Sequence, residues 1–158
     1  DAAIGASEAQ AEAFWKIRES ISEAERSHGP AMQHDISVPV DDMPRFIAAA
    51  SAEVERAFPG VWVNAYGHLG DGNVHFHVRA PEGCTDPNWR MTTGKATSRM
   101  VYDLVTAAGG SISAEHGIGQ MKRDELGRLS APARIQSLRA IKAAFDPLGI
   151  MNPGKLIP

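Results

Sequence analysis

The stretch VWVNAYGHLGDGNVHFHVRA, residues 61–80, decides how this chain folds. Both of its ends are rich in β-branched and aromatic side chains, and a glycine-rich segment centred on Asp71 and Gly72 separates them. Two such runs joined by a short Asp-Gly turn are typical of a β-hairpin. With Asp71 and Gly72 as the central residues of a tight turn, His68 is expected to lie directly opposite His75.

Strand and helix patterns flank this hairpin on both sides. Alternation of apolar residues indicates strands, and apolar residues three or four positions apart indicate helices. The resulting order of strand, helix, strand, strand, helix, strand is that of the ferredoxin-like, split βαβ arrangement. We therefore predict an α+β fold with an antiparallel sheet and extra N- and C-terminal helices. The predicted elements are strands at about 34–40, 61–68, 73–80 and 110–114, helices at about 42–58 and 90–108, a first helix at about 8–27 and a last helix starting near Ser130.

Both terminal helices are predicted to be amphipathic. Ser7 and Gln10 have the spacing of a capping box before the first of them. The segment GQMKRDELGR, which precedes the last helix, is polar and basic. The expected apolar sides are Phe14, Ile17, Ile21 and Ala24 in the first helix and Ile135, Leu138, Ile141 and Phe145 in the last.

Composition restricts the possible functions. A chain of 158 residues with 43% hydrophobic and 22% charged residues predicts one globular domain. The formal net charge of −3 gives no basic surface for nucleic acid or anionic lipid, and no apolar stretch approaches the roughly 20 residues of a membrane span. Cys84 is the single cysteine, which fits a reducing, cytoplasmic compartment. Because the chain begins at Asp1 rather than Met, we expect it to be part of a longer protein.

The predicted cross-strand histidines indicate a metal site. Directly opposed residues have Cβ atoms about 4.5–5.5 Å apart, so the imidazoles of His68 and His75 can reach one ion. Glu115 is the best candidate for a third ligand, because it follows a predicted strand of the same sheet and precedes Gly117. Two histidines and one carboxylate with an open position are typical of catalytic zinc, although manganese or iron would also accept them.

Structural roles are the alternative for these residues. His68 and His75 can be hydrogen-bonded strand histidines, and His77, expected opposite Tyr66, is as consistent with a surface position as with a ligand. Glu115 and His116 can form a solvated loop pair. The residues expected to be a solvated charge or an ordinary charged face are Arg18, Lys122, Arg123, Arg128, Arg134 and Arg139, and those expected to be structural histidines are His28 and His34.

Three segments are distinctive: GHLGDGNVH at 67–75, SAEHGIG at 113–119 and FDPLGIMNPGK at 145–155. They resemble, in the same order, the C-terminal domain of the FAD-linked 2-hydroxyacid dehydrogenases, and the likeness covers nearly the whole chain. In that family a separate N-terminal domain binds FAD, and the C-terminal domain is a ferredoxin-like cap with a metal and substrate site. The resemblance implies that residues 1–158 are a single cap domain of a larger flavoenzyme that oxidises a 2-hydroxyacid to the 2-oxoacid.

The resemblance also implies roles for individual residues. It places the divalent metal on His68, His75 and Glu115 and makes His116 the catalytic base. It implies that a first-helix arginine binds the substrate carboxylate. The other implied residues are Arg18, Ser22, Gln33, Asn73 and His77 for substrate and, near the flavin or the domain junction, Asn152 and Lys155.

One position departs from the family pattern. Gln33 stands where members often have lysine, and it can hydrogen-bond a carboxylate without neutralising its charge. The substrate is therefore expected to be a small 2-hydroxyacid of the D-lactate, glycolate or D-2-hydroxyglutarate type. The expected protein partners are the FAD domain of the same protein and, through apolar surface left uncovered, further copies of the chain.

Two other classes of function remain open on the sequence. One is a stand-alone metal-dependent hydrolase or lyase that uses the same His/His/Glu set. The other is a non-catalytic ferredoxin-like assembly module with structural histidines. The flavoenzyme reading predicts no turnover by this chain alone, the hydrolase reading predicts turnover with metal alone, and the assembly module predicts no metal binding.

Overall fold

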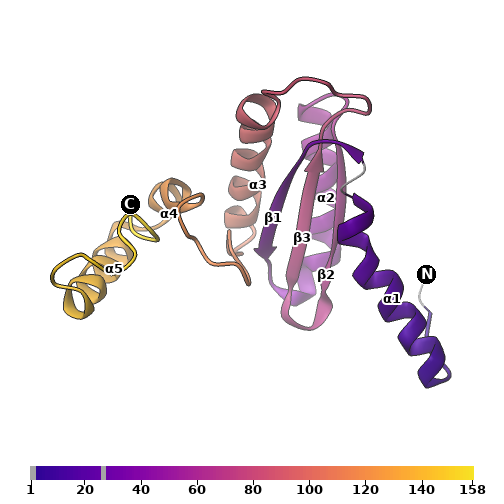
Figure 1. Cartoon of the computed structure of the whole chain (residues 1–158), viewed down its shortest axis with the longest axis horizontal. Helices are drawn as coiled ribbons and strands as arrows, with labels where there is room; N and C mark the ends of the chain where they lie inside the picture. The colour runs from indigo at the N-terminus through magenta and orange to yellow at the C-terminus, as the bar shows by residue number, and fades with distance from the viewer. Residues whose placement is uncertain (1–2, 26–27) are drawn as a thin grey trace.

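The computed structural model describes residues 3–25 and 28–158 and shows a mixed helix and sheet fold (Figure 1), which confirms the predicted α+β class. Short turns of 3-10 helix lie at Val40–Asp42 and Leu69–Asp71, and a π-helical turn lies at Arg90–Gly94. The elements are α1 (Glu8–Glu25), β1 (Ala31–Ser37), α2 (Met43–Ala57), β2 (Trp62–His68), β3 (Asn73–Arg79), α3 (Lys95–Ala107), α4 (Arg123–Leu129) and α5 (Pro132–Phe145).

The sheet is antiparallel, with the strand order β1-β3-β2. The predicted fourth strand is wrong as a strand: it is reduced to a single bridge between Ser37 and Ser111, on the edge beside β1 where the ferredoxin-like order places it. Its residues bond locally instead, since Ser111 Oγ donates to the carbonyl of Ser113 at 2.8 Å and accepts from its N–H at 3.3 Å. Such serine bonds compete with a strand ladder.

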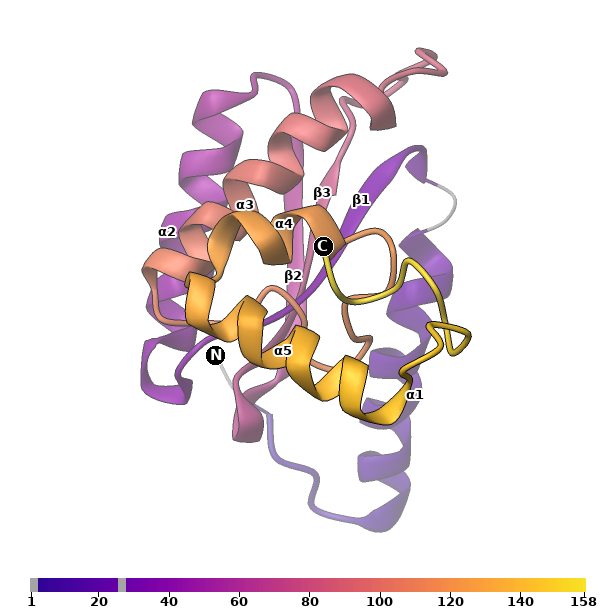
Figure 2. The same cartoon turned by 90° about the vertical axis from the view of Figure 1, so that its left-hand side faces the viewer.

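Helices α2 and α3 cover one face of the sheet, as Figures 1 and 2 show. Val74, Phe76 and Val78 of β3 point into this layer and are fully buried, because successive side chains of a strand alternate between its faces. Helix α2 meets them with a buried stripe at helical spacing. Its buried members are Met43, Phe46, Ala50 and Val54.

Several predicted boundaries shift for local reasons. Strand β1 ends at Ser37, not at residue 40, because Pro39 precedes a 3-10 turn that leads into α2. Helix α3 begins at Lys95 because the predicted first turn from Arg90 is π-helical. Half of the predicted capping box is present: Gln10 N–H donates to Ser7 Oγ at 3.3 Å, whereas the Gln10 side chain accepts from Ala6 N–H at 2.8 Å instead of from Ser7 N–H. The predicted end of this first helix at residue 27 lies outside the described residues.

The C-terminal segment forms an arm to one side of the sheet layer (Figures 1 and 2). The polar segment before α5 contains a helix, α4, that the sequence did not predict. In α5 only part of the expected apolar side is covered: Ile135 is buried, whereas Ile141 is 56% and Phe145 80% exposed. In the described part of the chain, the apolar side of α5 therefore has little to pack against.

Candidate functional site

The sheet face opposite α2 and α3 is polar. On β3, Asn73, His75, His77 and Arg79 alternate with the buried apolar residues and share this side. The strand pairing brings residues of β1 and β2 beside them. We call this set the polar face; its further members are Gln33 and Asp35 on β1 and Asn64, Tyr66 and His68 on β2.

The hairpin register differs from the predicted one by two residues. His68 pairs with Asn73, Tyr66 with His75, and Asn64 with His77, so the prediction of directly opposed His68 and His75 is wrong. The connection is a 3-10 turn followed by a left-handed glycine rather than a two-residue turn. A shift of two residues keeps every side chain on its face. His68 and His75 are therefore diagonal neighbours, with ring centroids 5.8 Å apart.

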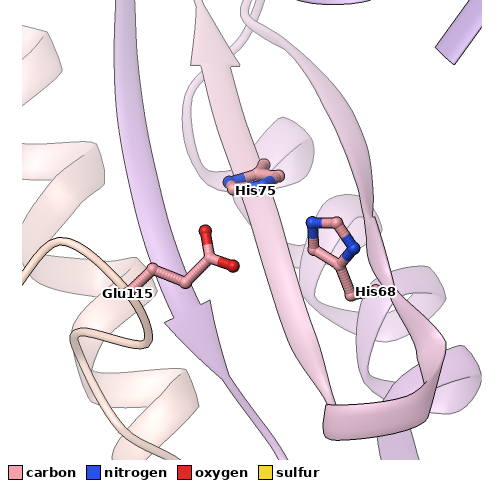
Figure 3. Close-up of side chains that lie close together, drawn as sticks. All are labelled: His68, His75 and Glu115. Carbon is pink, nitrogen blue, oxygen red and sulfur yellow. The ribbon is translucent and has the colours of Figure 1, made fainter. Parts of the chain in front are cut away.

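His68, His75 and Glu115 nevertheless converge. One ligand atom from each lies within 4.8 Å of the other two. Figure 3 shows the Glu115 carboxylate reaching from its loop towards the two imidazoles on the hairpin. His75 is half-buried, and this burial is the main reason that its pKa is lowered, against the raising effect of Asp35 and Glu115. The three residues predicted as metal ligands are thus together on the polar face.

Helix α1 lies against the polar face through a polar stripe of its own. Arg18 Nη2 lies 3.5 Å from His68 Nε2, and its guanidinium lies 4.9 Å from the centre of the Tyr66 ring. Ser22 Oγ lies 3.1 Å from the Tyr66 hydroxyl. Arg18 and Ser22 are one helical turn apart and contact alternate residues of β2. Both predicted substrate-binding residues of α1 therefore lie at the site.

The predicted apolar side of α1 is not its packing side. Phe14 is 43% and Ile17 65% exposed, while the helix end that packs on the sheet is marked by the buried carboxylate of Glu25. Helical periodicity identifies the apolar side of a helix, but it does not show whether the surface that covers this side belongs to the same chain.

His77 is buried under the end of α1. Its Nδ1 lies 2.6 Å from Glu25 Oε2, and the Glu25 carboxylate also accepts from the side-chain amide of Asn64. Arg79 completes this cluster by donating to the backbone carbonyl of Glu25 at 2.7 Å. With 5% of its surface exposed, His77 contacts substrate only if α1 moves. Its predicted partner Tyr66 is a diagonal neighbour, with ring centroids 5.3 Å apart.

Asp35 is a central residue of the site that the sequence did not predict. Its Oδ2 accepts the backbone N–H groups of Glu115 and His116, both at 2.8 Å, and its Oδ1 accepts from Asn73 Nδ2 at 3.2 Å. Burial alone would raise the pKa of Asp35. The N–H groups of His116 and Glu115, with the nearby charges of His116 and Lys122, lower it instead.

Lys122 is part of this arrangement and not of a solvated charged face. Its Nζ donates to Ser113 Oγ at 3.0 Å and to the backbone carbonyl of Asp35 at 3.4 Å. Burial lowers its pKa, against the raising effect of the Asp35 charge. A single charged residue in a polar segment gives no sequence signal for such a position.

The other predicted residues divide between the site and its surroundings. The His116 side chain is exposed, with its Nδ1 3.7 Å from Asp35 Oδ2 and its ring stacked 6.3 Å from that of His75. Gln33 is exposed on β1, opposite His77. Asn73 is 2% exposed, and its Oδ1 has no hydrogen-bond partner among the residues that the structure describes.

Two surface hollows differ in their relation to the histidines. One of about 390 Å³ adjoins them, because Arg18 and His68 line it together with Phe14 and Trp15. Another, of about 410 Å³, lies in the C-terminal arm and contains the exposed Asn152 and Lys155. No residue lines both hollows, so the structure does not bring Asn152 and Lys155 to the histidine site.

His34, predicted to be structural, lies on the opposite side of β1 from the polar face. It is fully buried, with Nδ1 2.7 Å from the carbonyl oxygen of Phe76 and Nε2 2.8 Å from Ser98 Oγ. Burial lowers its pKa to about 4. No helix within residues 3–25 and 28–158 is long and apolar enough to cross a membrane.

Comparison with known proteins places this geometry in a family. The chain matches the family described as FAD linked oxidases, C-terminal domain, over residues 1–156. It is 40% identical over 156 residues to D-2-hydroxyglutarate dehydrogenase of Stutzerimonas stutzeri (strain A1501), a match that covers 99% of this chain and 33% of that protein. It is 35% identical over 158 residues to the mitochondrial D-2-hydroxyglutarate dehydrogenase of Bos taurus, covering all of this chain and 28% of that protein.

These relatives are much longer than the part that is matched, since the chain spans about a third of their length or less. The match itself runs through all three distinctive segments and nearly the whole chain. The chain therefore belongs to the FAD linked oxidases, as a C-terminal domain of that family.

Proposed function

We propose that this chain is the substrate- and metal-binding cap domain of an FAD-dependent dehydrogenase that oxidises a 2-hydroxyacid to the 2-oxoacid. The observation that carries the proposal is the convergence of His68, His75 and Glu115 within 4.8 Å. Two of these residues come from the hairpin and one from a loop far along the sequence. Membership of an FAD-linked family supports the redox part of the proposal.

The donor set fits a divalent metal ion. Two imidazoles and a carboxylate favour zinc, with manganese or iron as alternatives. Burial lowers the pKa of His75, which favours the neutral imidazole that a metal ligand requires. Glu115 is exposed, so ligands from solution can approach the same point.

FAD would supply the hydride acceptor, and a divalent metal held by His68, His75 and Glu115 would supply Lewis-acid polarisation of the substrate oxygens. The residues of this chain bind the acid and move its proton. Arg18 binds the substrate carboxylate, with the Ser22 hydroxyl beside it. His116 takes the proton of the substrate hydroxyl, because imidazole is the side chain suited to proton transfer near neutral pH. The Asp35 carboxylate, 3.7 Å away, stabilises the imidazolium that results.

The remaining predicted residues take supporting roles in this proposal. Gln33, exposed on β1, hydrogen-bonds the distal end of the substrate. Asn73 and His77 are buried and act through the carboxylates of Asp35 and Glu25 that they contact. In the C-terminal arm, Asn152 and Lys155 contact the flavin or the junction with its domain.

The substrate is a small 2-hydroxyacid, and the names of the relatives favour D-2-hydroxyglutarate over D-lactate or glycolate. A cytoplasmic location and self-association through exposed apolar surface remain part of the proposal, although several relatives have mitochondrial in their names.

Metal analysis of the purified chain tests the site. After dialysis against trace zinc and manganese, we expect about one metal ion per chain, as for a single site of this ligand type. The double variant His68→Ala/His75→Ala should lose it, while the control His28→Ala, at an exposed histidine outside the site, should keep it. Equal metal in all three proteins would reject the ligand set.

The redox part needs the full-length flavoenzyme. D-2-hydroxyglutarate, D-lactate and glycolate are added separately under anaerobic conditions. The acid that is the substrate should reduce the flavin and bleach its visible absorption. Turnover by the 158-residue chain with metal alone would favour the stand-alone hydrolase or lyase instead.

A further inference from the structure

We infer that Asp35 is the positioning residue of this site, because its carboxylate holds the loop that carries Glu115 and His116 against the sheet. The inference rests on the proposed function for its meaning, since Glu115 is a proposed ligand and His116 the proposed base. Its geometry stands on its own. Asp35 lies on β1, whereas the two residues it holds are 80 and 81 positions away in the sequence.

The contacts of Asp35 fix three consecutive backbone amides. Its Oδ2 accepts the N–H groups of Glu115 and His116 at 2.8 Å each, and its backbone carbonyl accepts that of Ala114 at 3.2 Å. Hydrogen bonds to an ionised acceptor are stronger than those between neutral groups. Asp35 therefore fixes the position and the orientation of the loop backbone relative to β1 at the residues that carry the two functional side chains.

The loop has few other means of holding this shape. It has no regular secondary structure, and Gly117 and Gly119 have positive φ angles of 72° and 56°. The side chains of Glu115 and His116 are exposed, so packing does not fix them. Lys122 donates to Ser113 Oγ, and Ser113 Oγ donates to the Gly117 carbonyl at 2.7 Å, so one side-chain bond spans the loop. Neither bond contacts the amides of Glu115 and His116, which only Asp35 accepts among the described residues.

The ionised carboxylate of Asp35 serves all of these contacts at once. Oδ2 accepts from the loop while Oδ1 accepts from Asn73 Nδ2 at 3.2 Å. An asparagine at position 35 has one acceptor and one donor and carries no charge. Its oxygen accepts from the loop amides only as a neutral group, and its amide nitrogen meets a donor at Asn73 unless the Asn73 amide turns its unpartnered Oδ1 towards it. The substitution Asp35→Asn keeps the size of the side chain and removes this double acceptance.

A direct ligand role for Asp35 is the competing explanation, because Asp35, Glu115 and His116 also offer atoms within 4.8 Å of one another. The buried position of Asp35 and the two N–H groups already on Oδ2 favour positioning over ligation. The two explanations predict different results when Glu115 is removed.

The structure offers a matched control for a buried aspartate that holds a loop. In the C-terminal arm, Asp146 accepts the backbone N–H groups of Ile150 at 3.0 Å and Met151 at 2.9 Å. It is as buried as Asp35. Asp146→Asn should therefore cause a similar local loss in another loop and leave the histidine site intact.

The first test is amide hydrogen exchange by NMR on the metal-free chain. In Asp35→Asn, the amides of Glu115 and His116 should exchange roughly tenfold faster, because they then donate to a neutral acceptor instead of a charged one. Amides of β3 report any global loss of stability, and Asp146→Asn should leave Glu115 and His116 unchanged. Unchanged exchange of these two amides in Asp35→Asn would overturn the inference, whether or not the chain binds metal.

The second test is zinc affinity in a double-mutant cycle. Asp35→Asn should weaken binding about 10- to 100-fold, as is usual for groups that orient a ligand. In a Glu115→Gln background, it should have little further effect if Asp35 acts through Glu115. A full further loss in that background would show that Asp35 is itself a ligand. Absence of zinc binding by the unmodified chain would count against the proposed function alone, because the exchange test still decides the role of Asp35.

Discussion

The two faces of strand β3 show how one short segment serves stability and chemistry separately. Towards α2 and α3 it presents Val74, Phe76 and Val78, which are fully buried. Towards α1 and the loop after residue 111 it presents histidines, an arginine and an asparagine, which contact the carboxylates of Asp35 and Glu25 or the Glu25 backbone carbonyl. The apolar face therefore supplies the buried area that stabilises the fold, whereas the polar face depends on hydrogen-bond partners from distant segments.

Removal of a large side chain from the apolar face should have the largest effect. Phe76→Ala should lower the free energy of unfolding by about 3–5 kcal/mol, because it loses apolar burial and leaves a cavity. Urea unfolding measures the loss. Leu69→Ala, in the exposed turn of the same hairpin, should change stability by less than about 0.5 kcal/mol. Similar effects of the two substitutions would contradict the assignment of the core to this face.

A titratable residue on the helix-packed face gives the next largest effect. His34 has a pKa of about 4 in the folded protein and 6.5 as its ordinary value, so the unfolded chain binds more protons between these values. Its contribution to stability is therefore complete above pH 6.5 and is lost as the pH falls towards 4. The loss is on the order of 3 kcal/mol. Urea unfolding from pH 7 to 4.5 should show a shallower decline for His34→Gln than for the unmodified chain, and equal slopes would refute this.

Metal binding should stabilise the polar face by a comparable or smaller amount. At a zinc concentration about 100 times the dissociation constant, linkage adds about 2.7 kcal/mol to the unfolding free energy. Thermal unfolding with and without zinc measures this shift. It should vanish in His68→Ala/His75→Ala, and a shift that persists there would place the ion elsewhere.

The smallest effect is expected in the loop that completes the polar face. Gly117→Ala should cost about 1 kcal/mol, because its φ of 72° strains an L side chain although no atom lies within 4 Å of the added Cβ. Gly72→Ala is the informative contrast, since its φ is also 72° but the new Cβ would collide with the Val38 carbonyl. Equal losses in urea unfolding would show that backbone strain alone decides both positions.

The sequence predicted the apolar face better than the polar one. Alternation and helical periodicity are local patterns, so they located β1, β2, β3, α2 and α3 to within about five residues, although the predicted fourth strand is only a single bridge. The predicted hairpin register was wrong by two residues, because the turn sequence is compatible both with a two-residue connection and with a 3-10 turn that ends in a left-handed Gly72. His68 and His75 remained on one face, since a shift of two does not change the side of a strand.

The site was predictable where a motif is continuous and not where it depends on pairing between strands. His68, His75, Glu115 and His116 lie in glycine-rich segments that stand out along the chain. Asp35 lies in an ordinary strand, and its importance follows from the pairing of β1 with β3, which no local pattern gives. Glu25 and Lys122 were missed for the same reason, because each acts on a segment far away in the sequence.

The polar contacts that attach α1 to the sheet affect how often Arg18 lies at the site. Its contacts near the site are Arg18 with His68 and Ser22 with Tyr66, and such polar contacts are weaker determinants of cooperativity than apolar burial. We therefore expect the part of the helix before its buried Glu25 end to detach from the sheet in local opening events that leave α2, α3 and β3 folded. Arg18 then lies at the site only while the helix is attached. The equilibrium between the attached and detached states depends on salt and on whatever covers the exposed side of the helix.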